Sequence, residues 1–312
     1  MPKVERESTS EGETQNVKSR CSDNSHNLCS VRSDGSVDRG RNVACAKSRP
    51  GGWDGYLHYA SRVRRAVSRA WFWKTIVAYH LLDAGNVIGT FSNISVDEGA
   101  FGRFEFGYSR DVHSSGDNPE LSPLWNGGFN IVQGKVNIIR ENAGKHNWIP
   151  AISIGGVERT QVHNLGGVIA HVDRNNGDAY VVASKTIVAS WLHGVPIIAT
   201  GGVRGTNAEL WGFVGNATRF QGRVFGSVAF QLKGPGSSLI VLASEVAQQP
   251  AHPLNLPDAV IPTTITYAAR ILPSEKSRFN VDLGVAQLAN RIQPGVDLNA
   301  RHQFALGVSY HF

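Results

Sequence analysis

The chain has 312 residues, of which 41% are hydrophobic and 34 are glycine, and its formal net charge is +6. Glycine at this level without a Gly-X-Y period excludes collagen and is typical of tight turns and strand bends. A positive charge can indicate nucleic-acid binding, but the surplus lies in residues 1–80, with 14 Lys or Arg against 8 Asp or Glu, so no nucleic-acid partner is expected for the neutral remainder.

Residues 1–70 are rich in Ser, Arg, Asn and Asp and contain few clustered apolar residues. Such a segment cannot bury enough surface to offset the entropy of ordering. We therefore expect a disordered basic N-terminal segment, which processing could remove from the mature protein. Cys21, Cys29 and Cys45 lie within it without zinc-site spacing, so no metal site is expected.

Residues 62–82 place a basic run before an apolar segment that begins at Trp71. This is the order of a secretory signal, although it lies far from Met1, and Lys74 and His80 interrupt the apolar part. Three interpretations remain open: an internal signal, an amphipathic segment, or a first β-strand at 72–82.

From residue 86 onward, apolar and polar residues alternate with the period of a β-strand. The first pair of strands is predicted at 87–96 and 103–110, with a turn at Asp97-Glu98-Gly99. The further candidates are 130–140, 147–157, 178–188, 195–203, 207–215, 221–232, 237–247, 260–272, 277–287 and 301–312. Weaker candidates lie at 72–82 and 163–171, and turn residues lie at 204–206, 233–236 and 273–276.

Most of these strands are as long as the roughly nine to eleven residues that a tilted membrane strand needs, and longer than the typical five or six of soluble sheets. Short turns and long connections alternate in the C-terminal half, as they do in outer-membrane barrels. No apolar stretch approaches the roughly 20 residues of a transmembrane helix. The sequence therefore predicts an all-β fold over residues 71–312, an antiparallel transmembrane β-barrel of about 12–14 strands.

The last strand shows the alternation most clearly. Its candidate assembly signal is Phe304, Leu306, Val308, Tyr310 and Phe312, and small or polar residues alternate with these. In a membrane barrel the apolar face meets lipid and the polar face lines the lumen. Alternation alone does not distinguish this from a soluble sheet. A secreted or periplasmic β-sandwich that binds a ligand such as a glycan therefore remains the alternative.

The segment Phe304–Phe312 resembles the C-terminal signature of Gram-negative outer-membrane proteins. The resemblance implies an outer-membrane location, contact with outer-membrane lipids and insertion by the barrel-assembly machinery. Residues 150–156 and 179–185 are similar to paired strands of poorly characterised barrels associated with exopolysaccharide export, although here the long link 157–177 separates them.

Chemical motifs are sparse. The sequence contains no G-x-S-x-G, H-E-x-x-H or C-x-x-C motif, so we expect no enzyme, no catalytic residues, no metal site and no cofactor. A barrel lipid hydrolase using His163, His171 or His193 is a low-ranking third hypothesis. Charged side chains within strands are expected to face the lumen or lie near the rims, because charge is costly on a lipid-facing surface. The candidates are Arg103, Glu105, Arg140, Lys185, Glu209, Arg223, Arg270 and Asp282.

The leading hypothesis from the sequence is a non-enzymatic outer-membrane barrel that acts as a pore or as a structural or export component of the envelope. The solute, the openness of the lumen and the oligomeric state do not follow from the sequence.

Overall fold

The computed structural model describes residues 72–85, 89–115, 127–162, 175–188, 190–192, 194–209, 215–250, 263–274, 276–288 and 303–312. The predictions for residues 1–70, for a strand at 163–171 and for the three loop histidines lie outside these ranges. No helix in the described ranges is long and apolar enough to span a membrane.

Twelve strands account for most of the described chain. They are β1 (Phe72–Asp83), β2 (Gly89–Ala100), β3 (Phe104–Ser115), β4 (Phe129–Ile139), β5 (Ala151–Gln161), β6 (Asn175–Val188), β7 (Pro196–Glu209), β8 (Gly215–Lys233), β9 (Leu239–Ala247), β10 (Thr264–Leu272), β11 (Phe279–Leu288) and β12 (Gln303–His311). Two short 3-10 helices, η3 (Ala143–Lys145) and η4 (Ser190–Leu192), lie in the connections after β4 and β6.

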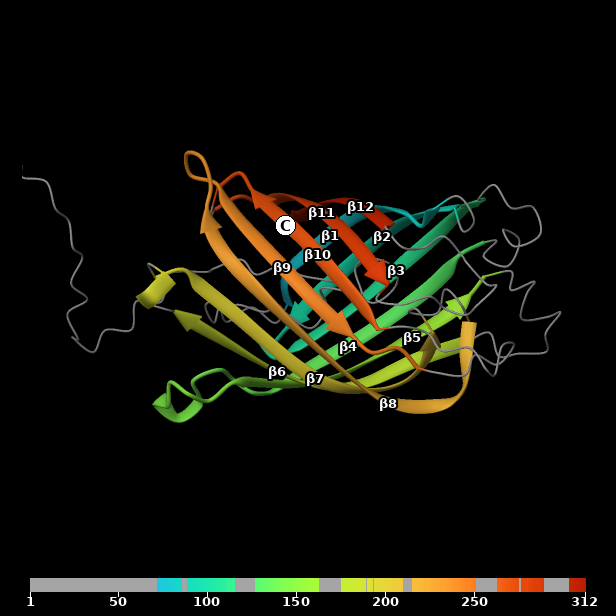
Figure 1. The fold of residues 1–312 in the computed structure, drawn as a ribbon, viewed down its shortest axis with the longest axis horizontal. Helices are drawn as coiled ribbons and strands as arrows, with labels where there is room; N and C mark the ends of the chain where they lie inside the picture. Colours follow the sequence, from blue (N-terminus) through green and yellow to red (C-terminus); the bar gives the residue numbers. More distant parts are fainter. Residues whose placement is uncertain are drawn as a thin grey trace, which may run out of the picture. The chain divides into compact units, whose positions relative to one another are not determined.

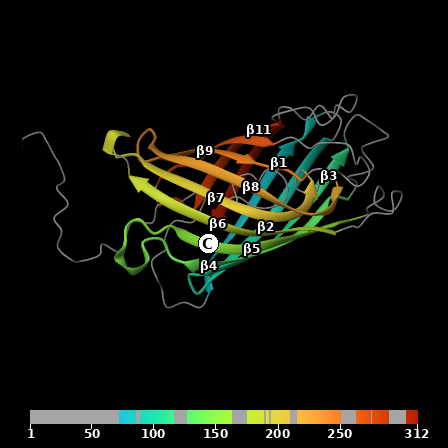
Figure 2. The same cartoon turned by 60° about the horizontal axis from the view of Figure 1, so that its bottom comes forward.

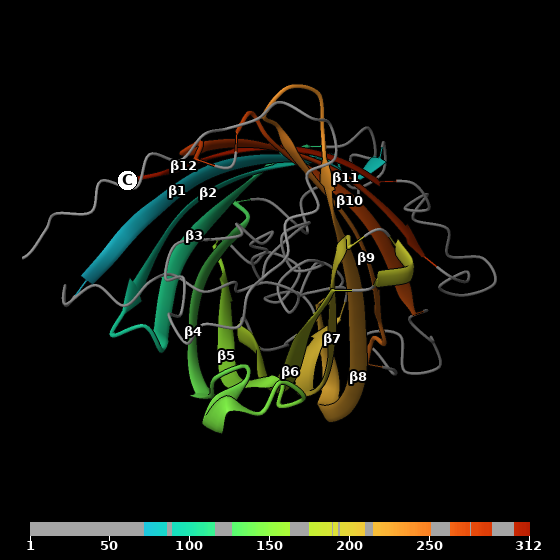
Figure 3. The ribbon, with the colours of Figure 1, turned by 90° about the vertical axis from the view of Figure 1, so that its left-hand side faces the viewer.

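The strands form one closed antiparallel barrel in which each strand pairs with its neighbour in the chain. Pairing of β1 with β12 closes the ring, with Ile76 opposite His311 and Asp83 opposite Phe304. The strands run obliquely across the barrel (Figure 1), a 60° turn brings β4 to β8 forward (Figure 2), and a view from one end shows the ring of strands (Figure 3). Closure leaves no unpaired sheet edge. The predicted barrel is confirmed, and the sandwich alternative is wrong because a sandwich requires two sheets.

The twelve strands confirm the predicted range of about 12–14, although two places in the chain differ from the expected assignment. The weaker candidate at 72–82 is a true strand, β1. The separate strands expected at 195–203 and 207–215 do not exist, because β7 runs unbroken through Arg204-Gly-Thr206. The glycine there lies within a strand beside a register shift between Thr206 and Ala208 rather than in a turn. A bulge and a turn use the same residue types, which explains the error.

The turn predicted at Asp97-Glu98-Gly99 is also misplaced, since these residues belong to β2. The chain reverses at Phe101 and Gly102, whose φ values are 52° and 63°, and the Arg103 amide donates to the Ala100 carbonyl at 3.1 Å. Two consecutive positive φ values suit the twist of a tight hairpin. The turns predicted at 233–236 and 273–276 are confirmed at the ends of β8 and β10.

The connections differ between the two ends of the barrel. One end, here called the short-turn end, carries the connections 101–103, 140–150, 189–195, 234–238 and 273–278. The other, the long-connection end, carries 84–88, 116–128, 162–174, 210–214, 248–263 and 289–302.

Alternation along each strand separates an inner from an outer face. In β2, Asn93, Ser95 and Asp97 are buried, whereas Ile94 and Val96 are exposed. The same alternation exposes large apolar side chains around the barrel, among them Tyr79, Phe106, Val132, Ile154, Val181, Val203, Val224, Leu242, Leu283 and Leu306. Trp148 and Trp191 are exposed in connections of the short-turn end, where a membrane–water interface favours tryptophan. A closed barrel with an apolar outer belt is the architecture of outer-membrane proteins.

Candidate functional site: the inner wall of the barrel

Polar side chains on the inner face form several separate clusters. The first, here called the closing seam, consists of His80 on β1, Arg270 on β10, Asp282 on β11 and Gly307 on β12. Arg270 donates to both Asp282 oxygens, with Nη2 2.6 Å from Oδ2, and His80 Nε2 lies 3.5 Å from the same Oδ2. His80 crosses β12 at Gly307, where an added Cβ would overlap the imidazole. The seam therefore ties the first strand to the penultimate strand across the last one.

A second cluster joins β5 and β6. Arg159 Nη2 lies 2.6 Å from Asp178 Oδ2, and both side chains are 1% exposed. Arg159 Nη1 is 3.5 Å from the Asn176 Oδ1 atom. A buried pair of this kind depends on both partners, because removal of either one leaves an uncompensated charge.

The cluster on β2–β4 repeats the geometry of the seam. Gln133 on β4 donates to Asp97 on β2 at 2.8 Å, across Gly107 of the intervening β3. An added Cβ at Gly107 would overlap both side chains. Beside it, Asn93 donates to Asp111. Glycine on the inner face thus opens a recess through which side chains two strands apart meet.

Arginines gather near the long-connection end of β7 and β8. Arg204 Nη2 donates to the Gln248 carbonyl at 2.9 Å and lies 3.3 Å from Gln249 Oε1. Arg223 Nε donates to the Gln249 carbonyl at 2.7 Å, and Gln249 donates to Thr264 Oγ1 at 3.1 Å. These contacts fix the chain that leaves β9 against the barrel wall.

Between the arginines and the short-turn end lies a group here called the Glu245 cluster: Ser227 on β8, Glu245 on β9 and Thr266 on β10. Glu245 is directly opposite Ser227 on one side and Thr266 on the other. The Glu245 side chain is buried, and neither carboxylate oxygen accepts a hydrogen bond in the described residues. The Ser227 and Thr266 hydroxyl oxygens likewise have no partner there.

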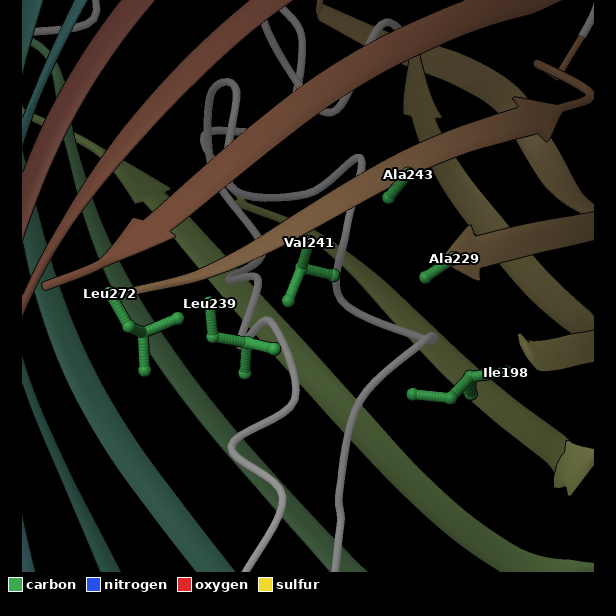
Figure 4. Close-up of a cluster of buried hydrophobic side chains, with 6 residues drawn as sticks. All are labelled: Ile198, Ala229, Leu239, Val241, Ala243 and Leu272. Carbon is green, nitrogen blue, oxygen red and sulfur yellow. The ribbon is translucent and has the colours of Figure 1, made fainter. Parts of the chain in front are cut away.

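Toward the short-turn end, the inner face of β7–β10 carries a group of buried apolar side chains beside the polar Gln231 and Arg270. The apolar side chains are those of Ile198, Ala229, Leu239, Val241, Ala243 and Leu272 (Figure 4). The outer face of β9 is apolar as well, apart from Ser244, so Glu245 is a single carboxylate within a largely apolar strand.

The charged residues singled out from the sequence divide into rim and wall positions. Arg103 lies in the β2–β3 turn and donates to the Ile138 carbonyl at 3.2 Å, and Arg140 is exposed just after β4. Lys185, near the end of β6, lies 3.5 Å from Glu141 Oε1. Glu209 is the last residue of β7.

The remaining candidates lie on the inner face. Glu105 on β3 is 3.9 Å from the Lys135 ammonium group, Arg223 binds the chain after β9, and Arg270 pairs with Asp282. Among the interactions described here for the residues of the predicted set, Arg270 with Asp282 is the pair that the structure brings into contact. A lumen lining made by these residues stays a prediction.

The residues of the candidate assembly signal share the outer face at the closure. Phe304, Leu306 and Tyr310 are exposed, and the Tyr310 and Phe312 rings are in edge contact at 4.9 Å. The Phe312 amide donates to the Thr75 carbonyl of β1 at 3.0 Å, so the terminal residue extends the closing ladder. Insertion by the assembly machinery stays a prediction.

Sequence reasoning missed His80, Arg159, Asp178, Arg204 and Glu245. The sequence pattern places Arg204 in a turn and Arg159 in a long link, whereas they belong to β7 and β5. Glu245 carries a usable signal, because it occupies an inner-face position in a strand whose other inner residues are apolar. The described residues contain no group of three or more His, Cys, Asp or Glu that could hold a metal ion.

The sequence matches no protein-family model and no curated protein. Among solved structures, the chain is similar to the KdgM porin, with 10% identity and a TM-score of 0.43 over 77% of this chain and 99% of that one. It is similar to the NanC porin at 10% identity and a TM-score of 0.46, over 76% and 98% of the two chains. The translocator domain of the autotransporter NalP from Neisseria meningitidis is 12% identical, with a TM-score of 0.32 over 77% and 87%. These likenesses are distant, so the geometry of the chain itself is the better guide to its function.

Proposed function

We propose that this protein forms a passage for polar solutes through the outer membrane. One observation carries the proposal: a closed barrel exposes an apolar outer belt, while Asn93, Thr200 and Gln231 represent the polar side chains of its inner wall. A wall of hydroxyl, amide and paired charged groups is costly to bury in an apolar core and suits contact with water and polar solutes.

The orientation follows from the connections. In outer-membrane barrels the short turns face the periplasm and the long connections face outward. On this basis the short-turn end, with Trp148 and Trp191, lies at the periplasmic interface. We further propose that the barrel-assembly machinery recognises the last strand through its outward aromatic residues.

Conductance across a planar lipid bilayer tests the pore. Protein whose folding is verified by heat-modifiable gel migration should give stepwise conductance in salt solution. Ala268→Trp should reduce the step, because Ala268 is on the inner face of β10 between Ala243 and Gly284. Tyr267→Trp is the matched control, since Tyr267 is exposed on the outer face of the same strand. The pore is refuted if folded, inserted protein shows no conductance.

A structural role in the envelope is the second candidate. It is favoured by the Arg159–Asp178 pair, a buried ion pair at 2.6 Å that joins β5 to β6 and so serves the barrel wall itself. The same experiment decides between the two, because a structural barrel folds and inserts but passes no current.

A further inference from the structure

The Glu245 carboxylate differs from the other inner-face carboxylates in its hydrogen bonding. Asp97, Asp178 and Asp282 each accept a hydrogen bond from a side chain on another strand. Glu245 is 1% exposed and accepts none among the described residues. A buried polar group without a partner is rare and calls for a ligand or another specific explanation.

The residues on either side of Glu245 also carry polar groups that are available for hydrogen bonding. Ser227 and Thr266 face Glu245 from either side in the strand register, and the hydroxyl oxygen of each has no partner in the described part of the chain. Three adjacent strands thus offer a carboxylate that only accepts hydrogen bonds and two hydroxyls that both donate and accept.

The surroundings distinguish two classes of ligand. A hard cation requires about six to eight oxygen ligands, whereas this site offers one carboxylate and two hydroxyls, and the strand carbonyls are engaged in the ladder. The Arg204 guanidinium also lies within electrostatic range of Glu245 and opposes a second positive charge. A neutral polyhydroxylated molecule fits better, because adjacent hydroxyls can donate to the two carboxylate oxygens while Ser227 and Thr266 exchange hydrogen bonds with its other hydroxyls.

We propose that Ser227, Glu245 and Thr266 form a binding subsite on the inner wall for a neutral polyhydroxylated solute, of the chemical class of an oligosaccharide. The inference rests on the proposed pore, since the solute reaches the subsite from the lumen. Glu245 is the central acceptor, and the two hydroxyls hold the solute on either side.

Isothermal titration calorimetry on the full chain, folded in a detergent without a sugar headgroup, tests the subsite. The probes are neutral hexasaccharides of glucose, galactose and mannose, titrated separately. At least one should bind, and Glu245→Gln should weaken that binding by about tenfold or more, because a charged acceptor is exchanged for a neutral amide. Glu158→Gln is the matched control on the outer face of β5 and should bind as the original chain does.

Every outcome of the titration is informative. If none of the three hexasaccharides binds, or if both variants bind equally well, the subsite is refuted. Binding of Na⁺ or Ca²⁺ that Glu245→Gln abolishes would replace it with a cation site. If Glu245→Gln fails the heat-modifiability test, Thr266→Val takes its place and should weaken binding severalfold. Calorimetry requires no conductance, so failure of the subsite and failure of the pore are distinguishable.

Discussion

At the closing seam, Arg270 Nη2 lies 2.6 Å from the Asp282 carboxylate and His80 Nε2 lies 3.5 Å from it, whereas on β9 the Glu245 carboxylate receives no hydrogen bond from the described residues. Both carboxylates are on the inner face. A carboxylate matched by charged donors contributes to holding strands together, while an unmatched one is a cost to folding. The difference separates residues that hold the strands together from the carboxylate that we propose contacts a solute.

We expect the largest effect on barrel assembly from a substitution that fills the recess at Gly307. Gly307→Val should prevent the barrel from closing, because the new side chain would occupy the position of the His80 imidazole. Loss of the heat-modifiable band and of protein from the outer-membrane fraction measures the effect. Gly201→Val is the control, since an added Cβ at Gly201 has open space around it. Normal assembly of Gly307→Val would show that the seam is dispensable.

Removal of charge from the seam should have the next largest effect. Asp282→Asn leaves the Arg270 guanidinium, whose side chain is 6% exposed, without its counter-charge. The free energy of unfolding in lipid vesicles, measured by urea titration, should fall by about 3 kcal/mol. The double variant Arg270→Met with Asp282→Leu should regain most of it. Equal losses in the single and double variants would contradict a coupled pair.

Deletion of Phe312 should affect the closure between β1 and β12 more mildly. It removes the hydrogen bond to Thr75 and the ring contact with Tyr310, so the purified barrel should lose about 1 kcal/mol of unfolding free energy. If the last strand is also recognised during assembly, the fraction of protein inserted in cells should fall much further than this. Equal levels of inserted protein would contradict a role in assembly.

The smallest effect is expected at the unmatched carboxylate. Glu245→Gln should change the unfolding free energy by less than about 1 kcal/mol, or increase it, because an amide is less costly to bury than a carboxylate that receives no hydrogen bond from the described residues. Urea titration beside Asp282→Asn provides the direct comparison. A loss as large as that of Asp282→Asn would identify Glu245 as structural and remove the contrast.

The barrel can be predicted from the sequence because successive side chains of a β-strand point to opposite faces of the sheet. Every second side chain of β12 faces outward, so Phe304, Leu306 and Tyr310 indicate both strand and lipid-facing side. Strand boundaries were harder to predict. Gly205 within β7 and Gly99 within β2 have the composition of turns, and only the register with neighbouring strands distinguishes a glycine in a ladder from one in a reversal.

The inner clusters could not be predicted for a different reason. Arg270 and Asp282 are both recognisable as strand charges, yet their pairing depends on the register between β10 and β11. The contact between His80 and Asp282 depends on closure of the ring, which joins residues 202 positions apart in the chain. The lack of a hydrogen bond to Glu245 among the described residues likewise becomes visible only once the register places Ser227 and Thr266 beside it.

The recesses at Gly107, Gly155, Gly202 and Gly307 also affect how far side chains project into the lumen. At each one a neighbouring side chain lies across the glycine, such as Tyr180 over Gly155 and Phe225 over Gly202, where an added Cβ would overlap the ring. A side chain that lies flat along the wall takes up little of the cross-section, whereas one lifted off the wall projects toward the axis. A methyl group at Gly155 would therefore act beyond its own position: it would press on the Gly134 carbonyl of the neighbouring strand and turn the Tyr180 ring toward the lumen.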